Sequence, residues 1–156
     1  MEVMITIGVT GHRFLDDSPK LIRTIDKALE IIDSQFEPPF IFISPLAEGA
    51  DRLVPYRAFA RWEDTRLLVS LPLDVEDYMA DFETLSSKAD FVNLLQLADK
   101  IFQPPKVSSR ESAYKAAGER VIDLCDVLIA IWDGAEPQGK GGTAEMVALA
   151  RKKSMP

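Results

Sequence analysis

The segment Gly8-Val9-Thr10-Gly11-His12-Arg13 contains residue types that could bind a phosphate. It follows directly after a short apolar run. Glycines allow a tight turn that leaves backbone N–H groups open to an anion, and Arg13 could add a bidentate pair with phosphate oxygens. The alternative is an ordinary turn with a solvated arginine and a histidine that caps the next helix. The candidate ligand-binding residues are Gly8, Thr10, Gly11, His12 and Arg13.

A second segment, Ser44-Pro45-Leu46-Ala47-Glu48-Gly49-Ala50-Asp51, follows another apolar run. Gly49 would let the start of a helix pack closely on the sheet or on a ligand. Glu48 or Asp51 could accept hydrogen bonds from ribose hydroxyls, as acidic residues do in dinucleotide-binding folds. Alternatively, both carboxylates only stabilise the positive end of that helix. The candidates here are Ser44, Glu48, Gly49 and Asp51.

A third segment, Gly139-Lys140-Gly141-Gly142-Thr143-Ala144-Glu145, is a glycine run that opens a predicted helix. The N–H groups and the dipole at such a helix start favour an anion, and Thr143 could cap the helix and contact a phosphate oxygen. The alternatives are a flexible surface loop and, for Glu145, simple compensation of the helix dipole. The run has neither the P-loop spacing nor the GxGxxG pattern. The candidates are Gly141, Gly142, Thr143 and Glu145, together with Asp133 after the preceding apolar run.

The elements that must position these segments alternate along the chain. Continuous apolar runs predict buried strands at residues 3–9, 40–43, 67–71 and 127–132, and a short strand at 100–103. Helical spacing of apolar residues predicts a helix that begins at Ser18-Pro19 and others over 48–62, 83–100, 110–124 and 143–152. In the helix over 83–100, the residues predicted to face inward are Leu85, Ala89, Val92 and Leu95.

This alternation predicts an α/β fold: a Rossmann-like three-layer sandwich with a mostly parallel sheet, helices on both faces and residues 3–9 central. Ligands of such sheets bind outside the carboxyl ends of the strands, near the switch in strand order, where all three segments converge. We expect residues 1–156 to form a single Rossmann-like nucleotide-binding domain. Because the last helix ends where a closing strand should begin, we also expect this domain to be cut at its C-terminus from a longer protein.

Composition narrows the classes of function. The apolar fraction of 47% and the charged fraction of 28% are ordinary for a soluble domain, while the net charge of −7 disfavours nucleic acid and anionic membrane surfaces. One histidine and one cysteine cannot form a His/Cys zinc site, so we expect no metal. Cys125 lies in an apolar run and is expected to be a buried, inert thiol. The sequence shows neither a membrane span nor a basic leader, and we expect a cytoplasmic location.

The three segments together, in this order, resemble the SLOG superfamily, which unites the DNA-processing protein A fold with the Lonely Guy (lysine-decarboxylase-like) proteins. The segment from Ser44 to Asp51 is similar to the Ser-Gly-x-Ala-x-Gly-Ile-Asp motif of the first branch, and Thr10 to Arg13 is similar to its Gly-Ser-Arg loop. Gly142-Thr143 with Glu145 resembles the Gly-Thr-x-x-Glu helix start of the second. The resemblance spans nearly the whole chain and implies a Rossmann-like domain that binds nucleotides or their derivatives, in some members as a sensor.

The third segment departs from the Lonely Guy pattern Pro-Gly-Gly-x-Gly-Thr-x-x-Glu. Aligned on Gly142-Thr143, the catalytic glutamate of that pattern falls on Met146, and Glu145 lies one residue off. That offset is about 100° around a helix. We therefore expect no phosphoribohydrolase activity on adenosine monophosphate.

The favoured hypothesis is a binding or sensor domain for a nucleotide-derived phosphorylated ligand, with no certain cofactor and with a homo-oligomer or a fused effector domain as its partner. The alternative is an enzyme, a nucleotide N-glycosidase or nucleoside transferase, with Glu145 or Glu48 as the catalytic carboxylate. A third hypothesis is a DNA-processing accessory. The base, the number of phosphates and the oligomeric state are left open.

Overall fold

The computed structural model describes residues 4–11, 19–132 and 142–156. Their strands form one five-stranded sheet in the order β4-β3-β2-β1-β5, and every neighbouring pair is parallel. The strands are β1 (Ile5–Gly11), β2 (Phe40–Ser44), β3 (Arg66–Ser70), β4 (Lys100–Phe102) and β5 (Val127–Ile131). The helices are α1 (Pro19–Gln35), α2 (Ala50–Arg61), α3 (Val75–Met79), α4 (Leu85–Leu97), α5 (Arg110–Leu124) and α6 (Thr143–Lys152).

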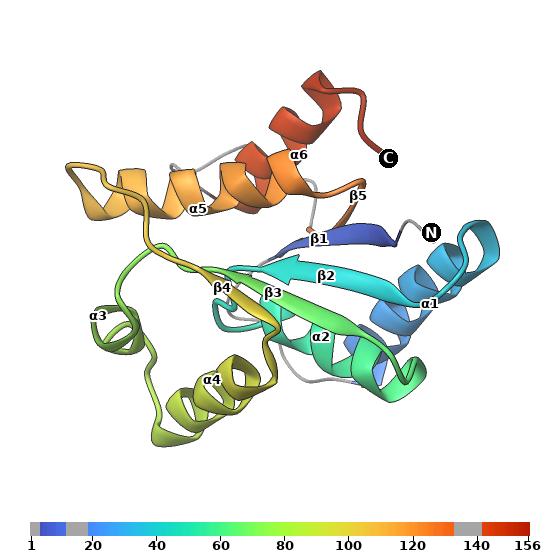
Figure 1. Ribbon diagram of the computed structural model, residues 1–156, viewed down its shortest axis with the longest axis horizontal. Coiled ribbons are helices and arrows are strands. Elements are labelled where there is room, and N and C mark those ends of the chain that lie inside the picture. Colours follow the sequence, from blue (N-terminus) through green and yellow to red (C-terminus); the bar gives the residue numbers. More distant parts are fainter. Residues whose placement is uncertain (1–3, 12–18, 133–141) are drawn as a thin grey trace.

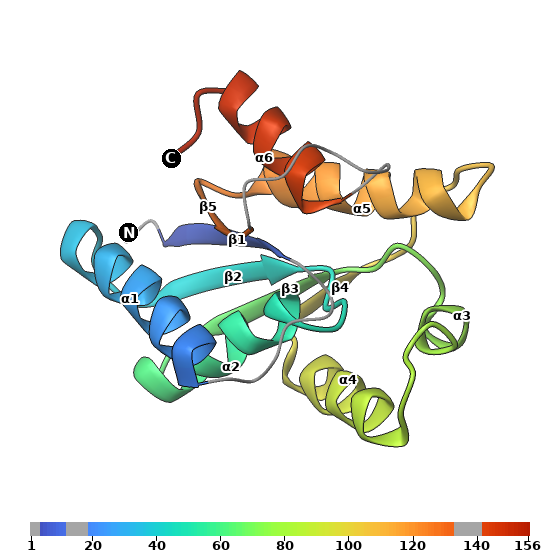
Figure 2. The same ribbon diagram turned by 180° about the vertical axis from the view of Figure 1, so that it is seen from behind.

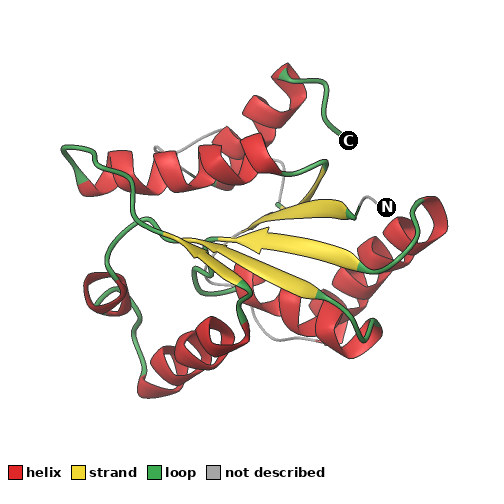
Figure 3. Cartoon of the chain, viewed as in Figure 1, coloured by secondary structure: helices red, strands yellow, loops and turns green. Residues whose placement is uncertain are grey.

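Helices cover both faces of the sheet, so the predicted Rossmann-like α/β sandwich is confirmed. Helices α1, α2 and α4 lie on one face and α5 and α6 on the other (Figures 1 and 2), and Figure 3 shows the yellow strands between these two helical layers. Successive side chains of a strand point to opposite faces of the sheet, so each face has its own buried cluster. Phe42 belongs to the main buried cluster with Val54 of α2, whereas Ile43, the next residue, packs with Val121 of α5 and with Cys125, which caps that helix.

The position of β1 differs from the prediction. The sequence places residues 3–9 at the centre of the sheet, but β2 is the middle strand and β1 lies between β2 and β5. The strand order reverses at β1, since β2, β3 and β4 follow on one side of it and β5 lies on the other. The switch point, where such sheets bind ligands, is therefore the gap between the carboxyl ends of β1 and β5.

The inward face of α4 was predicted wrongly except at Leu95, which is half-buried and packs against the main cluster. Leu85 is 84% exposed and Val92 is exposed, whereas Phe91 and Leu94 are buried. The sequence of this helix offers two apolar stripes, and the aromatic one is buried because it completes a cluster. The ring of Phe91 lies 5.1 Å from that of Phe82 and 5.4 Å from that of Tyr78, between centroids.

The chain returns to β5 after α6. Within the described residues β5 is an edge strand, and its Leu128 N–H donates to the carbonyl oxygen of Pro156 at 2.9 Å. None of the described helices combines the length and the apolar character that a membrane crossing needs.

Candidate functional site

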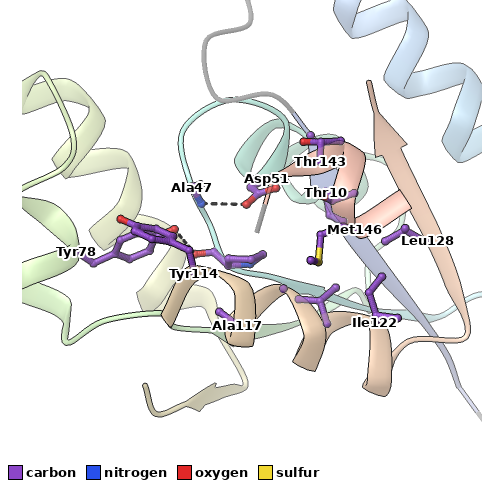
Figure 4. Close-up of a pocket in the computed structure, with 16 residues that line it drawn as sticks. Thr10, Ala47, Asp51, Tyr78, Tyr114, Ala117, Ile122, Leu128, Thr143 and Met146 are labelled. Carbon is purple, nitrogen blue, oxygen red and sulfur yellow. Dashed lines mark hydrogen bonds between the residues drawn. The ribbon is translucent and has the colours of Figure 1, made fainter. Parts of the chain in front are cut away.

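A cavity of about 210 Å³ opens at the switch point, at the carboxyl end of β1 (Figure 4). Its wall comes from the end of β1, the loop between β2 and α2 with the first turn of α2, the short helix α3, the middle of α5, strand β5 and the start of α6. The described lining residues are Val9, Thr10, Gly11, Pro45, Ala47, Asp51, Tyr78, Tyr114, Ala117, Gly118, Val121, Ile122, Leu128, Gly142, Thr143 and Met146.

The end of β1 brings Thr10 and Gly11 to the cavity because Gly11 lacks a side chain. A Cβ added at Gly11 would lie 2.3 Å from the Cβ of Ala50, the first residue of α2, and 3.3 Å from the Cβ of Ile131. The first distance is far below ordinary van der Waals contact, and the second is slightly shorter than it. Glycine at this position therefore lets the start of α2 pack directly against the last residue of the strand, beside the cavity.

The loop between β2 and α2 is folded by its own polar side chains. The Ser44 hydroxyl donates to the Asp51 carbonyl at 2.7 Å and accepts from the Leu46 N–H at 3.1 Å. The Asp51 carboxylate accepts from the Ala47 N–H at 3.2 Å, as the dashed line in Figure 4 shows. Gly49 has φ 93°, a conformation that L side chains rarely adopt, and its carbonyl accepts the first hydrogen bonds of α2. These contacts place the buried Asp51 in the cavity wall.

The start of α6 forms the opposite wall of the cavity. Gly142 is the N-cap, and the first bond of the helix runs from the Met146 N–H to the Gly142 carbonyl at 3.0 Å. The N–H groups before that bond have no partner within the helix, and the helix dipole adds about half a positive charge there. Among the residues that the structure describes, a Cβ added at Gly142 would meet no atom within 4 Å.

The remaining wall is apolar or aromatic. Ala117, Val121 and Ile122 come from α5, and Met146 points toward them from α6 (Figure 4). Gly118 permits this approach of the two helices, because a Cβ there would lie 2.5 Å from the Met146 Sδ.

Two tyrosines close the end of the cavity farthest from α6. The Tyr78 hydroxyl donates to the Pro45 carbonyl at 3.0 Å, which ties α3 to the loop after β2. The Tyr114 hydroxyl donates to the Asp81 carboxylate. Taken together, the lining is polar at the end of β1 and at the start of α6, and it is apolar along α5.

Five of the residues that the sequence singled out line this cavity together: Thr10, Gly11, Asp51, Gly142 and Thr143. Two more, Ser44 and Gly49, lie in the same loop and shape it. Gly8 lies beneath α5 instead, since a Cβ there would be 2.8 Å from the Cys125 Sγ. The other candidates, His12, Arg13, Asp133 and Gly141, lie outside the described residues.

The two glutamates that were candidates for catalysis have other contacts. A Glu48 carboxylate oxygen accepts from the Ser87 hydroxyl of α4 at 2.8 Å. Glu145 forms an ion pair with Lys115 of α5 at 3.3 Å. Neither is among the cavity-lining residues, and Met146, not Glu145, lies in the wall. Among the described residues that line the cavity, Asp51 is the one with a carboxylate.

Sequence reasoning missed the contribution of α5 and α3. Tyr114, Ala117 and Val121 belong to the helix that the sequence predicts over 110–124, and their spacing is that of any buried helix face. The single signal was Gly118, because a glycine inside a helix costs about 1 kcal/mol relative to alanine and so indicates a close approach. No group of three or more His, Cys, Asp or Glu side chains that could hold a metal ion occurs in the described ranges.

Burial affects the thiol and one guanidinium near the site. Burial raises the pKa of the Cys125 thiol to about 11, and this side chain is buried, as the sequence predicts. Burial also lowers the pKa of the Arg52 guanidinium, while the nearby Glu48 carboxylate opposes that shift.

Comparison with known proteins adds information on the fold. No protein-family model and no curated protein matches the chain. The structure of DNA processing protein A (DprA) from Streptococcus pneumoniae superposes with a TM-score of 0.65 and 14% identity, covering 97% of this chain and 48% of that one. The structure of TM1055, a structural genomics target, superposes with a TM-score of 0.57 and 13% identity, covering 98% of this chain and 72% of that one.

The chain shares the fold of the part of the DprA structure that it covers. The resemblance that the three sequence segments indicated is thereby confirmed at the level of the fold. The chain spans about half the length of the DprA chain (48%), and identities of 13–14% carry nothing beyond the shared architecture.

Proposed function

We propose that this chain is a binding domain for a nucleotide or a nucleotide-derived phosphorylated ligand. The observation that carries the proposal is the division of the cavity wall. Gly11 at the strand end and Gly142-Thr143 at the helix start lie on one side, and Val121, Ile122 and the other apolar residues lie on the other. A nucleotide has the same division, with a charged phosphate at one end and a flat, weakly polar ring at the other.

Each side of the cavity has a role in this proposal. The N–H groups of Gly142 and Thr143 bind the phosphate, since a helix start offers both donors and a favourable dipole. Asp51 accepts a hydrogen bond from a sugar hydroxyl, the role that acidic residues have in dinucleotide-binding folds. The apolar wall of α5 packs against the base. The domain then passes its ligand state to attached or partner domains.

The test is a thermal-shift screen over nucleotides and ADP-ribose derivatives. A ligand at 100 times its dissociation constant adds about 2.7 kcal/mol to stability, which raises the melting temperature by roughly 5–10 °C for a domain of this size. A Gly142→Val variant should lose that shift, because its side chain enters the space in front of α6.

The matched control for Gly142→Val is Ala148→Val, at an exposed position of the same helix. It should keep the ligand-induced shift and lose only about 0.5 kcal/mol of stability from its helix propensity. A screen in which no phosphorylated ligand shifts the melting temperature would contradict the proposal, as would an equal shift in both variants.

A second candidate is an enzyme that cleaves or transfers the N-glycosidic bond of a nucleotide. The buried Asp51 carboxylate in the cavity wall favours it, because such chemistry needs a carboxylate as nucleophile or general base. Release of free base from nucleoside monophosphates distinguishes the two candidates. Release that is lost in Asp51→Asn would establish the enzyme.

A further inference from the structure

Leu46, in the loop after β2, has an unusual backbone conformation. Its φ is 60°, and its side chain is fully buried. This left-handed region is unfavourable for a leucine, so the surrounding structure must hold it there. On its N–H side, Leu46 is fixed by the hydrogen bond that its N–H donates to the Ser44 hydroxyl at 3.1 Å.

The hold on the other side is the buried guanidinium of Arg52 in α2. Its Nε donates to the Leu46 carbonyl at 2.9 Å, and its Nη1 donates to the Ser87 carbonyl at 2.8 Å and to the Ser87 hydroxyl at 2.9 Å. The same guanidinium lies 4.3 Å from the ring centroid of Phe82 and 5.7 Å from that of Phe91. Arg52 therefore connects the loop after β2 to α4.

Glu48 completes this network. The Glu48 carboxylate accepts from the Ser87 hydroxyl at 2.8 Å, so Ser87 forms hydrogen bonds with both Glu48 and Arg52. A buried guanidinium needs a nearby carboxylate, because an uncompensated charge in the interior is costly. Glu48 thus supports Arg52 from within the loop and does not line the cavity.

The consequence of the network lies one residue beyond Leu46. Ala47 lines the cavity, and its N–H donates to the Asp51 carboxylate. The peptide group between Leu46 and Ala47 has its carbonyl fixed by Arg52 and its N–H fixed by Asp51. Rotation of that one peptide would move the N–H away from Asp51 and change the wall of the cavity.

We propose that Arg52 is a positioning residue for the ligand: held by Ser87, it keeps Leu46 left-handed and so presents Ala47 and Asp51 to the cavity in their binding arrangement. This role rests on the proposed nucleotide-binding function. It means that ligand affinity also depends on Arg52, which lies outside the cavity, and on α4, which carries Ser87.

The experiment compares the native chain with Arg52→Met, Ser87→Ala and the control Arg57→Met. Arg57 is on the same helix, and its exposed side chain pairs with Asp26. The first readout is amide hydrogen exchange at Ala47 in the ligand-free protein, and the second is calorimetric titration with adenosine 5′-monophosphate well below the melting temperature. Ser87→Ala keeps the experiment decisive should Arg52→Met fail to fold.

We expect Ala47 to exchange at least about tenfold faster in Arg52→Met and Ser87→Ala than in the native chain, and nucleotide affinity to fall by about tenfold, because the loop must be reordered on binding. Arg57→Met should leave both readouts unchanged. Unchanged exchange would overturn the inference whether or not the native chain binds the nucleotide. Faster exchange with unchanged affinity would also overturn it. Absence of binding by the native chain would count against the proposed function, and exchange would still decide whether Arg52 holds the loop.

Discussion

Substitution of Gly11 by alanine tests how the strand end and α2 are fitted beside the cavity. The new Cβ would lie 2.3 Å from the Cβ of Ala50. Two carbons need about 3.5–4.0 Å, so the start of α2 must retreat by roughly 1.5 Å. The end of β1 is held at this position, because Gly11 is paired with Ile131 of β5.

Overpacking of this kind costs about 1–3 kcal/mol, and the firmly held neighbours of Gly11 place Gly11→Ala near the upper end. The melting temperature should fall by roughly 6–10 °C for a domain of this size. Ala50→Gly removes the opposing methyl group and should cost about 1 kcal/mol alone, from helix propensity. In the double variant the clash is absent.

The assay is urea unfolding followed by circular dichroism for the four members of this double-mutant cycle. The double variant should be more stable than Gly11→Ala alone, with a coupling of about 2 kcal/mol, which exceeds the additivity error of about 0.5 kcal/mol. Additive costs would refute the reasoning, because they would mean that Ala50 is not what excludes a side chain at Gly11. A neutral Gly11→Ala would refute it as well.

Three further outcomes are expected. Asp26→Asn should lower stability by about 0.5–1 kcal/mol at pH 7. The Arg57 guanidinium lowers the pKa of Asp26, so this difference should be full above pH 3.8 and shrink as the pH falls through the lowered pKa, in unfolding curves at several pH values. Burial raises the pKa of Cys125 from 9.0 to about 11, so its contribution to stability should be full below pH 9 and lost as the pH rises to about 11. Cys125→Ala should flatten that part of the curve of stability against pH. An equally steep loss of stability in the variant would contradict this. Finally, adenosine monophosphate should release no adenine, because Met146 stands where the pattern that the start of α6 resembles has its catalytic glutamate. Release that disappears in Glu145→Gln, measured by chromatography, would show that the helix register was misjudged.

Much of the fold was predictable because buried parallel strands are short continuous apolar runs. Residues 40–43 and 127–132 were recognised in this way, and the structure places β2 and β5 there. The helix start at Thr143 was predicted from the glycine run before it and is observed. These signals are local, so one sequence suffices to find them.

The parts that sequence reasoning missed depend on contacts between distant segments. In α4, Leu85 and Val92 form a stripe with good helical spacing, but Phe91 is buried because Tyr78 and Phe82 lie beside it. Helix α3 has five residues, too few to show a period. Arginine is a residue type that is usually solvated, and only the fold reveals that Arg52 is buried against Phe82.

The candidate site was predictable in part for the same reason. Gly11 ends a strand, Asp51 lies in the first turn of a helix and Gly142 caps one, so their places on the rim follow from topology. Tyr114 and Met146 lie on helix faces that look like ordinary core, and their position in the cavity wall results from how α5 and α6 meet across Gly118.

The most direct test of nucleotide binding is a crystal structure of the chain with adenosine 5′-monophosphate. The phosphate oxygens should accept hydrogen bonds from the N–H groups of Gly142 and Thr143, at the 2.7–3.2 Å typical of such bonds, with the base against the apolar wall of α5. A phosphate bound elsewhere on the molecule would contradict the account, as would a base at the start of α6 with the phosphate in solvent.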